Sequence, residues 1–103
     1  MRVELSASAL HDLECIGDYI AQDSPQQAKS FVKKLRGQCT RVANTPLAFR
    51  LRTELGTNIR SSAYGNYVIF FYADDNVLRI LRILHGSMDI EPQFNKTPPS
   101  PPK

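Results

Sequence analysis

The sequence predicts an α+β domain of order β-α-α-β-β-β, with a helical hairpin packed on a small twisted antiparallel sheet. Two segments in the first half repeat apolar residues at spacings of three and four, as amphipathic helices do. Residues 67–84 hold two apolar, β-rich runs joined by a polar turn, the pattern of a β-hairpin. The chain has 103 residues and is 42% apolar, which is enough for one domain with one modest core.

The chain opens with a short strand and a first helix. Residues 2–5 alternate charged and apolar side chains, which indicates a half-exposed strand. Ser6 is a suitable N-cap, because its hydroxyl can accept from a free amide of the first turn. The helix is expected over residues 7–22, with an apolar stripe of Leu10, Leu13, Ile16 and Ile20. The acids Asp12, Glu14 and Asp18 are expected on its other faces.

A second helix follows after a very short connection. Ser24 can cap it, and Pro25 suits the first helical position, where its missing N–H is harmless. Its apolar stripe continues to Val42, and Asn44-Thr45-Pro46 is a stop signal, so the helix should end near Ala43. The short link makes the two helices an antiparallel pair with both stripes facing one sheet. Gly17 weakens the first helix, and close approach to the second helix is a plausible reason.

The second half should supply three more strands. Residues 47–58 have the composition of a loop, and residues 59–63 that of a short strand. Residues 67–72 form the central strand, because they are aromatic and β-branched almost throughout. Asp74-Asp75-Asn76 should turn the chain, since Asp and Asn tolerate left-handed conformations. The last strand then covers residues 77–84.

The pattern of the fold ends near residue 89, so the domain is expected over residues 1–89. Residues 90–103 are rich in proline and should form a disordered or extended tail. No run is long enough to cross a bilayer and no signal peptide opens the chain, so a cytoplasmic protein is expected. Cys15 and Cys39 lack partners at metal-ligand spacing, so neither a metal nor a cofactor is expected.

The charge is unevenly distributed, although the net charge is only +3. Residues 1–28 hold one arginine against five acids, whereas residues 29–60 hold eight basic residues against one acid. A basic middle suggests an acidic partner, either nucleic acid or an acidic protein segment. The simpler interpretation of the helix lysines is a solvated helix face.

Six short pieces, in this order and spacing, resemble the ParE branch of the RelE/ParE superfamily, the toxic halves of bacterial type II toxin–antitoxin pairs. The similarity covers about residues 2–89. The pieces are Leu5-Ser6 with Asp12-Leu13 and Asp18-Tyr19-Ile20-Ala21; Asn44-Thr45-Pro46; Glu54-Leu55-Gly56; Ile59-Arg60-Ser61; Tyr67-Val68-Ile69-Phe70; and Leu81-Arg82-Ile83-Leu84-His85-Gly86.

The resemblance implies an α+β toxin that a cognate, ParD-like antitoxin wraps with an extended or helical segment. The resemblance is compatible with two cellular targets. ParE-like members inhibit DNA gyrase and are not known as nucleases, whereas RelE-like members cut messenger RNA in the ribosome. A third possibility is a non-toxic binding module with the same fold. Fold does not decide between them, so the residues must.

RNA cleavage without a metal needs an acid, a base and cations for the phosphorane. The candidates for a nuclease are Arg60, Arg82 and His85. RelE-like cutters usually carry a tyrosine and basic residues beyond His85, but this chain continues Gly86-Ser87-Met88-Asp89 and has no tyrosine after Tyr72. We therefore favour a non-enzymatic gyrase inhibitor. Its candidate target-binding residues are Arg50, Arg52, Arg60, Arg79 and Arg82.

The last strand also bears on the partners of the protein. By alternation, Arg82 and Leu84 share a face with Leu78 and Ile80, and an arginine there needs a target contact or a structural salt bridge. If this strand lies at a sheet edge, its unpaired backbone and apolar side chains invite aggregation unless a partner covers them. The candidate antitoxin-binding residues are therefore Leu78, Ile80, Leu81, Ile83 and Leu84.

Overall fold

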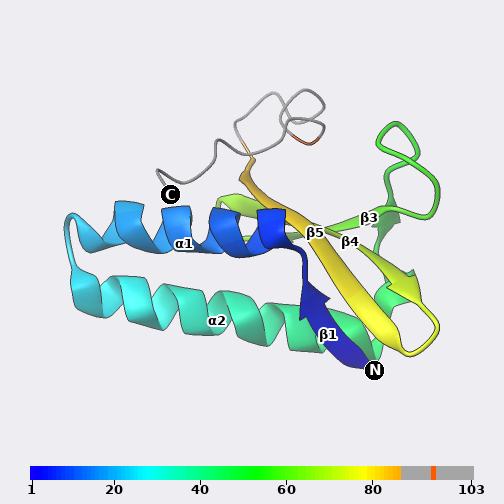
Figure 1. Ribbon diagram of the computed structural model, residues 1–103, viewed down its shortest axis with the longest axis horizontal. Helices are drawn as coiled ribbons and strands as arrows, with labels where there is room; N and C mark the ends of the chain where they lie inside the picture. The colour runs from blue at the N-terminus through cyan, green and yellow to red at the C-terminus, as the bar shows by residue number, and fades with distance from the viewer. Residues whose placement is uncertain (87–93, 95–103) are drawn as a thin grey trace.

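The computed structural model describes residues 1–86 and Phe94. The elements are β1 (Arg2–Leu5), α1 (Ala7–Ala21), α2 (Pro25–Asn44), a 3₁₀ turn (Pro46–Ala48), β2 (Arg50–Leu51), β3 (Arg60–Tyr64), β4 (Tyr67–Asp74) and β5 (Val77–His85). The five strands form one sheet in the order β1-β5-β4-β3-β2 (Figure 1). The predicted tail, residues 90–103, lies outside the described residues apart from Phe94.

The α+β class and the order of the predicted elements are confirmed, but the sheet is mixed rather than antiparallel throughout. β3, β4 and β5 are joined by tight turns and therefore pair antiparallel. β1 pairs with β5 in parallel, with Arg2 opposite Val77 and Leu5 opposite Ile80. A strand brought to its neighbour by the fold is under no such constraint, because no hairpin turn sets its direction.

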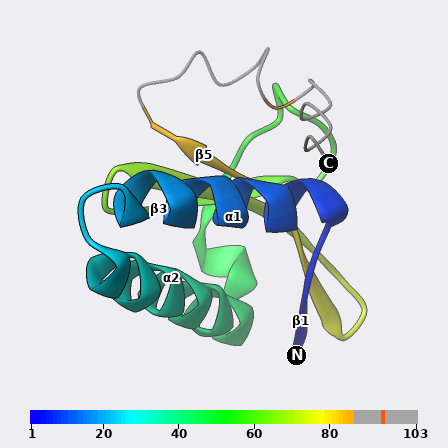
Figure 2. The ribbon, with the colours of Figure 1, turned by 60° about the vertical axis from the view of Figure 1, so that its left-hand side comes forward.

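The two helices lie side by side on one face of the sheet, as Figures 1 and 2 show. Both predicted caps are present, since the hydroxyl of Ser6 accepts from the Ala9 amide at 3.0 Å and that of Ser24 from the Gln27 amide at 3.2 Å. A Cβ at Gly17 would lie 3.4 Å from Cγ2 of Val32 on α2. The close approach expected at Gly17 is therefore confirmed.

The core lies between the helices and the sheet. Its buried members are Ala9, Leu13, Ile16, Leu35, Cys39, Val42, Ala43, Ile69, Phe71, Leu78, Ile80 and Ile83. Two predictions for α1 are wrong. Leu10, expected in the apolar stripe, is 43% exposed, and Asp12, expected on a solvent face, is only 8% exposed. The buried face of α1 is rotated toward the side on which Asp12 lies, and the next section gives its partner.

β5 contains a register shift that simple alternation does not foresee. Phe71 lies opposite Ile80 and Phe70 opposite Arg82, so the pairing skips Leu81. An extra residue of this kind reverses the faces of all residues that follow it. Ile83, rather than Leu84, therefore joins Leu78 and Ile80 in the core between sheet and helices. The expected face shared by Leu78, Ile80 and Leu84 is wrong for this reason.

β5 is not an edge strand, so the condition for an exposed apolar edge is not met. β1 pairs with its first half, and residues of the α1 segment bond its second half. The hydroxyl of Ser6 donates to the carbonyl of Leu81 at 2.8 Å, and the amide of Ile83 donates to Oδ2 of Asp12 at 3.0 Å. The edges of the sheet are β1 and β2.

Two smaller features complete the fold. The segment expected to be a loop contains β2, which pairs with β3 through Arg50 and Leu51. Asp75 turns the chain between β4 and β5 with φ of 54°, the left-handed conformation expected of an Asp-rich turn. Of the two helices in the described part of the chain, neither is long and apolar enough to cross a membrane.

Candidate functional site

Arg82, a candidate for both target binding and catalysis, forms a buried ion pair with Asp12 of α1. Its Nε and Nη2 atoms donate to Oδ2 and Oδ1 of Asp12 at 2.7 and 2.9 Å, and Arg82 is only 7% exposed. Asp12 also accepts from the amide of Ile83, so one carboxylate fixes both the side chain and the backbone of β5. Of the two roles that the sequence left open, the structure gives Arg82 the salt bridge.

Two further candidate arginines are held by acids of this chain. Nη1 of Arg79 donates to Oε1 of Glu4 at 2.7 Å, and its Nε lies 3.8 Å from Asp74. Nε of Arg52 donates to Oε2 of Glu54 at 2.8 Å, and this bond is the main reason why the pKa of Glu54 is lowered. Both arginines are therefore partly neutralised within the fold.

The remaining two candidate target-binding arginines, Arg60 and Arg50, differ in their side-chain contacts. Nη1 of Arg60 donates to the carbonyl of Phe49 at 2.7 Å and approaches that of Leu47 at 3.5 Å, so Arg60 ties β3 to the segment before β2. Arg50 is exposed on β2, and its side chain makes no hydrogen bond or ion pair with the described residues, although its backbone pairs with β3. Of the five candidate target-binding arginines, Arg50 alone is unpaired within that part of the chain.

The three nuclease candidates do not meet. Arg60 begins β3, while His85 lies opposite Tyr67, which in turn lies opposite Tyr64 at the other end of β3. Arg60 and Tyr64 are four residue steps apart on β3, so Arg60 and His85 are about 13 Å apart along the strand direction alone. Arg82 is meanwhile engaged by Asp12. No single phosphate can contact Arg60, Arg82 and His85 in this arrangement.

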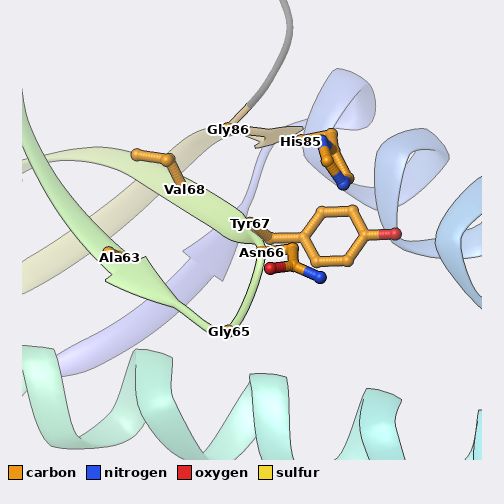
Figure 3. Close-up of a pocket in the computed structure, with 7 residues that line it drawn as sticks. All are labelled: Ala63, Gly65, Asn66, Tyr67, Val68, His85 and Gly86. Atoms are coloured by element: carbon orange, nitrogen blue, oxygen red, sulfur yellow. The ribbon is translucent and has the colours of Figure 1, made fainter.

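Tyr67 and His85 instead border a shared hollow at the end of β4 and β5. Their rings pack edge to face at a centroid distance of 5.2 Å, and both side chains project toward the helices (Figure 3). Adjoining hollows of about 360 and 440 Å³ share Tyr67, His85 and the turn residues Gly65 and Asn66. Tyr19, Ile20 and Phe31 of the helices line the larger one.

The chemistry of these hollows is apolar and aromatic. Burial, with a smaller contribution from Tyr19, raises the pKa of Tyr67, so its phenol stays protonated at neutral pH. None of the described residues that line the two hollows is a lysine or an arginine. The hollows can therefore accept a flat or apolar group, but the residues described there supply no cation for a developing phosphorane.

The candidate antitoxin-binding residues of β5 belong largely to the core. Leu78, Ile80, Ile83 and Leu84 are 0 to 4% exposed, and only Leu81 is half-buried. The expectation that they form an apolar surface is corrected, because β1 and α1 cover β5. Among the described residues, the large hydrophobic side chains that are exposed are Met1, Leu10, Tyr19, Leu47 and Leu51.

The described residues hold no cluster of three or more His, Cys, Asp or Glu side chains that suits a metal ion. Cys15 is exposed and its Sγ lies 3.4 Å from Nε2 of His11, but burial and nearby acids raise its pKa. Cys39 is buried in the core, and burial raises its pKa to about 11. Both thiols are therefore poor nucleophiles at neutral pH.

Sequence reasoning missed two features of the surface and the core. Asp12 is the only acid on the core-facing side of α1, and Arg82, the buried one of the two arginines of β5, is its natural complement. The exposed cations of α2 fit a solvated face by sequence, yet α2 contains no acid at all. That absence of acids is visible in the sequence and predicts that the cations stay unpaired.

Known proteins resemble this chain in sequence and fold. The profile of the ParE toxin of type II toxin–antitoxin systems, parDE, matches residues 3–90. Toxin RelE2 of Caulobacter vibrioides is 35% identical over 79 residues, which cover 77% of this chain and 88% of that protein.

Two solved structures share the fold. A chain of the chromosomal ParDE system from P. aeruginosa has a TM-score of 0.68 and 20% identity, and a chain of the toxin–antitoxin complex RelBE2 from Mycobacterium tuberculosis has a TM-score of 0.54 and 26% identity. Each match covers 82% of this chain and 95% of the other. The first supports the fold alone, because its identity is so low.

Proposed function

The chain belongs to the ParE toxin family of type II toxin–antitoxin systems, and from this premise we propose that it inhibits DNA gyrase in the cytoplasm and is neutralised by a cognate ParD-like antitoxin. The main observation that favours gyrase inhibition over RNA cleavage is that the three nuclease candidates lie apart. Arg60 and His85 lie at different ends of the sheet, and Arg82 is bound to Asp12. A metal-independent nuclease needs these groups around one phosphate.

The alternative is a ribosome-dependent endoribonuclease, and the 35% identity to toxin RelE2 favours it. In that case His85 would act as the acid or base, because it is the only imidazole among the three nuclease candidates. Its ring borders the hollow beside Tyr67, where a nucleobase has room. The two functions therefore differ in what they require of His85.

The experiment that separates them measures both activities on the same purified protein. We expect inhibition of gyrase-catalysed supercoiling and intact messenger RNA by primer extension in a translating extract. His85→Ala should retain both toxicity in cells and gyrase inhibition, with Tyr67→Phe as the matched control in the same hollow. Cleaved message with normal supercoiling, abolished in His85→Ala, would replace the gyrase proposal with the nuclease.

Arg50 is our first candidate for target contact, because it is exposed and unpaired among the described residues, whereas Arg52, Arg60, Arg79 and Arg82 are engaged in the fold. Arg50→Gln should weaken gyrase inhibition without loss of stability. Arg79→Gln serves as the comparison, since it removes the same charge from a residue that Glu4 already neutralises.

For the antitoxin we propose a contact at the β2 edge of the sheet. Leu47 and Leu51 are 73% and 44% exposed, and β2 presents a short edge to which an extended segment can add. Leu47→Asp with Leu51→Asp should weaken antitoxin binding in a pull-down. Leu10→Asp, an equally polar change on α1, should leave it intact, and the reverse ranking would move the contact to the helices.

A further inference from the structure

The solvent-facing side of α2 carries an unusual concentration of positive charge. Five cations lie on this 20-residue helix, and all are exposed: Lys29, Lys33, Lys34, Arg36 and Arg41. The helix contains no acid, and none of the five makes an ion pair with any residue that the structure describes. The charge of the basic middle region therefore resides mainly on α2, since Arg52 and Arg60 are engaged elsewhere.

The five cations form two rows along the helix. Lys29, Lys33 and Arg36 follow one another at spacings of four and three residues, and Lys34 and Arg41 lie seven residues apart on the other flank. From Lys29 to Arg41 the rows extend about 18 Å along the axis. The strip between the rows holds the small, uncharged residues Ser30 and Gly37. A Cβ at Gly37 would have no neighbour within 4 Å.

This arrangement works against the helix that carries it. Lys29 and Lys33 are like charges one turn apart, and Lys33 and Arg36 are likewise neighbours. Only Arg41, in the last turn, lies where the helix dipole favours a cation. Gly37 in the helix interior lowers helix stability further. An external polyanion would remove this repulsion, and none of the described residues does so.

We propose that α2 binds the phosphate backbone of duplex DNA. Exposed α2 residues beyond Pro25 include no apolar or aromatic side chain, so the face lacks the anchors on which protein partners depend. The missing aromatics also argue against single strands, whose bases stack on such side chains. Lysine, arginine, serine and threonine are the usual phosphate contacts, and small residues let a backbone approach closely.

The shape of the face favours DNA over duplex RNA. Two basic rows separated by a narrow neutral strip suit a helix with phosphates on both flanks. The major groove of B-form DNA admits an α-helix between its two backbones, whereas that of A-form RNA is too deep and narrow. The inference does not depend on the proposed function, because α2 would bind DNA directly and gyrase is not required.

The test is fluorescence anisotropy of the full-length protein with a labelled DNA duplex of two helical turns, over a series of salt concentrations. If all five cations contact phosphates, log K should fall with log salt with a slope of about −4.5. Lys29→Gln with Lys33→Gln should reduce the slope to about −2.7 and the affinity at 0.1 M salt roughly 50-fold. Both side chains are exposed, and circular dichroism will confirm that the helix is retained.

The matched control removes the same charge elsewhere. Arg2→Gln with Arg79→Gln has the same net charge as the α2 double variant, and both arginines already pair with Glu4. We expect it to keep the slope of the parent protein. Equal losses in the two double variants, an absence of DNA binding at low salt, or tighter binding to duplex RNA or poly-glutamate than to DNA would each overturn the proposal.

Discussion

Removal of the Asp12 carboxylate should destabilise this protein more than any other single change on α1. Asp12→Ala removes the carboxylate that pairs with the buried guanidinium of Arg82. It also removes the acceptor of the Ile83 amide. Breaking a buried ion pair costs about 3–5 kcal/mol. An unsatisfied buried amide costs about 1–3 kcal/mol more. The sum approaches the total stability of an ordinary domain, about 5–15 kcal/mol.

Urea unfolding, followed by circular dichroism, measures the free energy of unfolding of each variant. Asp18→Ala is the control, because Asp18 is an exposed acid on the same helix and should change stability by less than about 0.5 kcal/mol. Asp12→Leu with Arg82→Met removes both charges and should be less destabilised than Asp12→Ala alone. A cost below about 1 kcal/mol for Asp12→Ala would refute the reasoning that this pair fixes α1 to β5.

The double variant also separates structure from function. If Arg82 serves only the fold, Asp12→Leu with Arg82→Met should remain toxic wherever it folds. If Arg82 contacts the target or a phosphate, the folded double variant should lose activity. The comparison uses a replacement that restores packing, so a loss of activity is not explained by unfolding.

Gly37→Ala should raise the free energy of unfolding by about 0.5–1 kcal/mol in urea, because it adds helix propensity where no neighbour lies within 4 Å. Gly56→Ala should lower it by about 1–3 kcal/mol, since φ is +150° and the new Cβ would lie 2.8 Å from Cδ1 of Ile59; a neutral result would contradict that geometry. The buried Cys39 thiol has a pKa raised from 9.0 to about 11, so stability should be intact below pH 9 and fall by up to ~1.4 kcal/mol per pH unit from pH 9 to 11. Cys39→Ala should flatten that alkaline decline, as measured by urea unfolding at each pH.

The helices were predictable because their signals are local. Ser6 and Ser24 cap the first turns through hydroxyls only three residues from the amides they accept, and Pro25 fits the first turn of α2 without any help from the rest of the fold. The turn at Asp75 is equally local. Caps and turns depend on a few neighbouring residues, so a sequence window contains all the information that they need.

The faces of β5 were not predictable in the same way. Alternation assigns Leu84 to the side of Leu78 and Ile80, but the skipped Leu81 places Ile83 there instead. The skip coincides with the point where β1 ends and residues of the α1 segment take over its hydrogen bonds. That exchange of partners is a tertiary event, and no residue type within the run marks it.

The same difference between local and tertiary signals explains which charged residues of the candidate sites were predictable. An arginine on a strand lies among carbonyls and acids from distant segments, so whether Arg60 or Arg79 is engaged depends on the folded sheet. A lysine on a helix finds its nearest partners one turn away, so a helix without acids leaves its lysines unpaired wherever it packs. The free cations of α2 were therefore within reach of the sequence, whereas the occupied arginines of the sheet were not. For this reason a search for target contacts should begin with Lys29, Lys33 and Arg50 rather than with the arginines of β5.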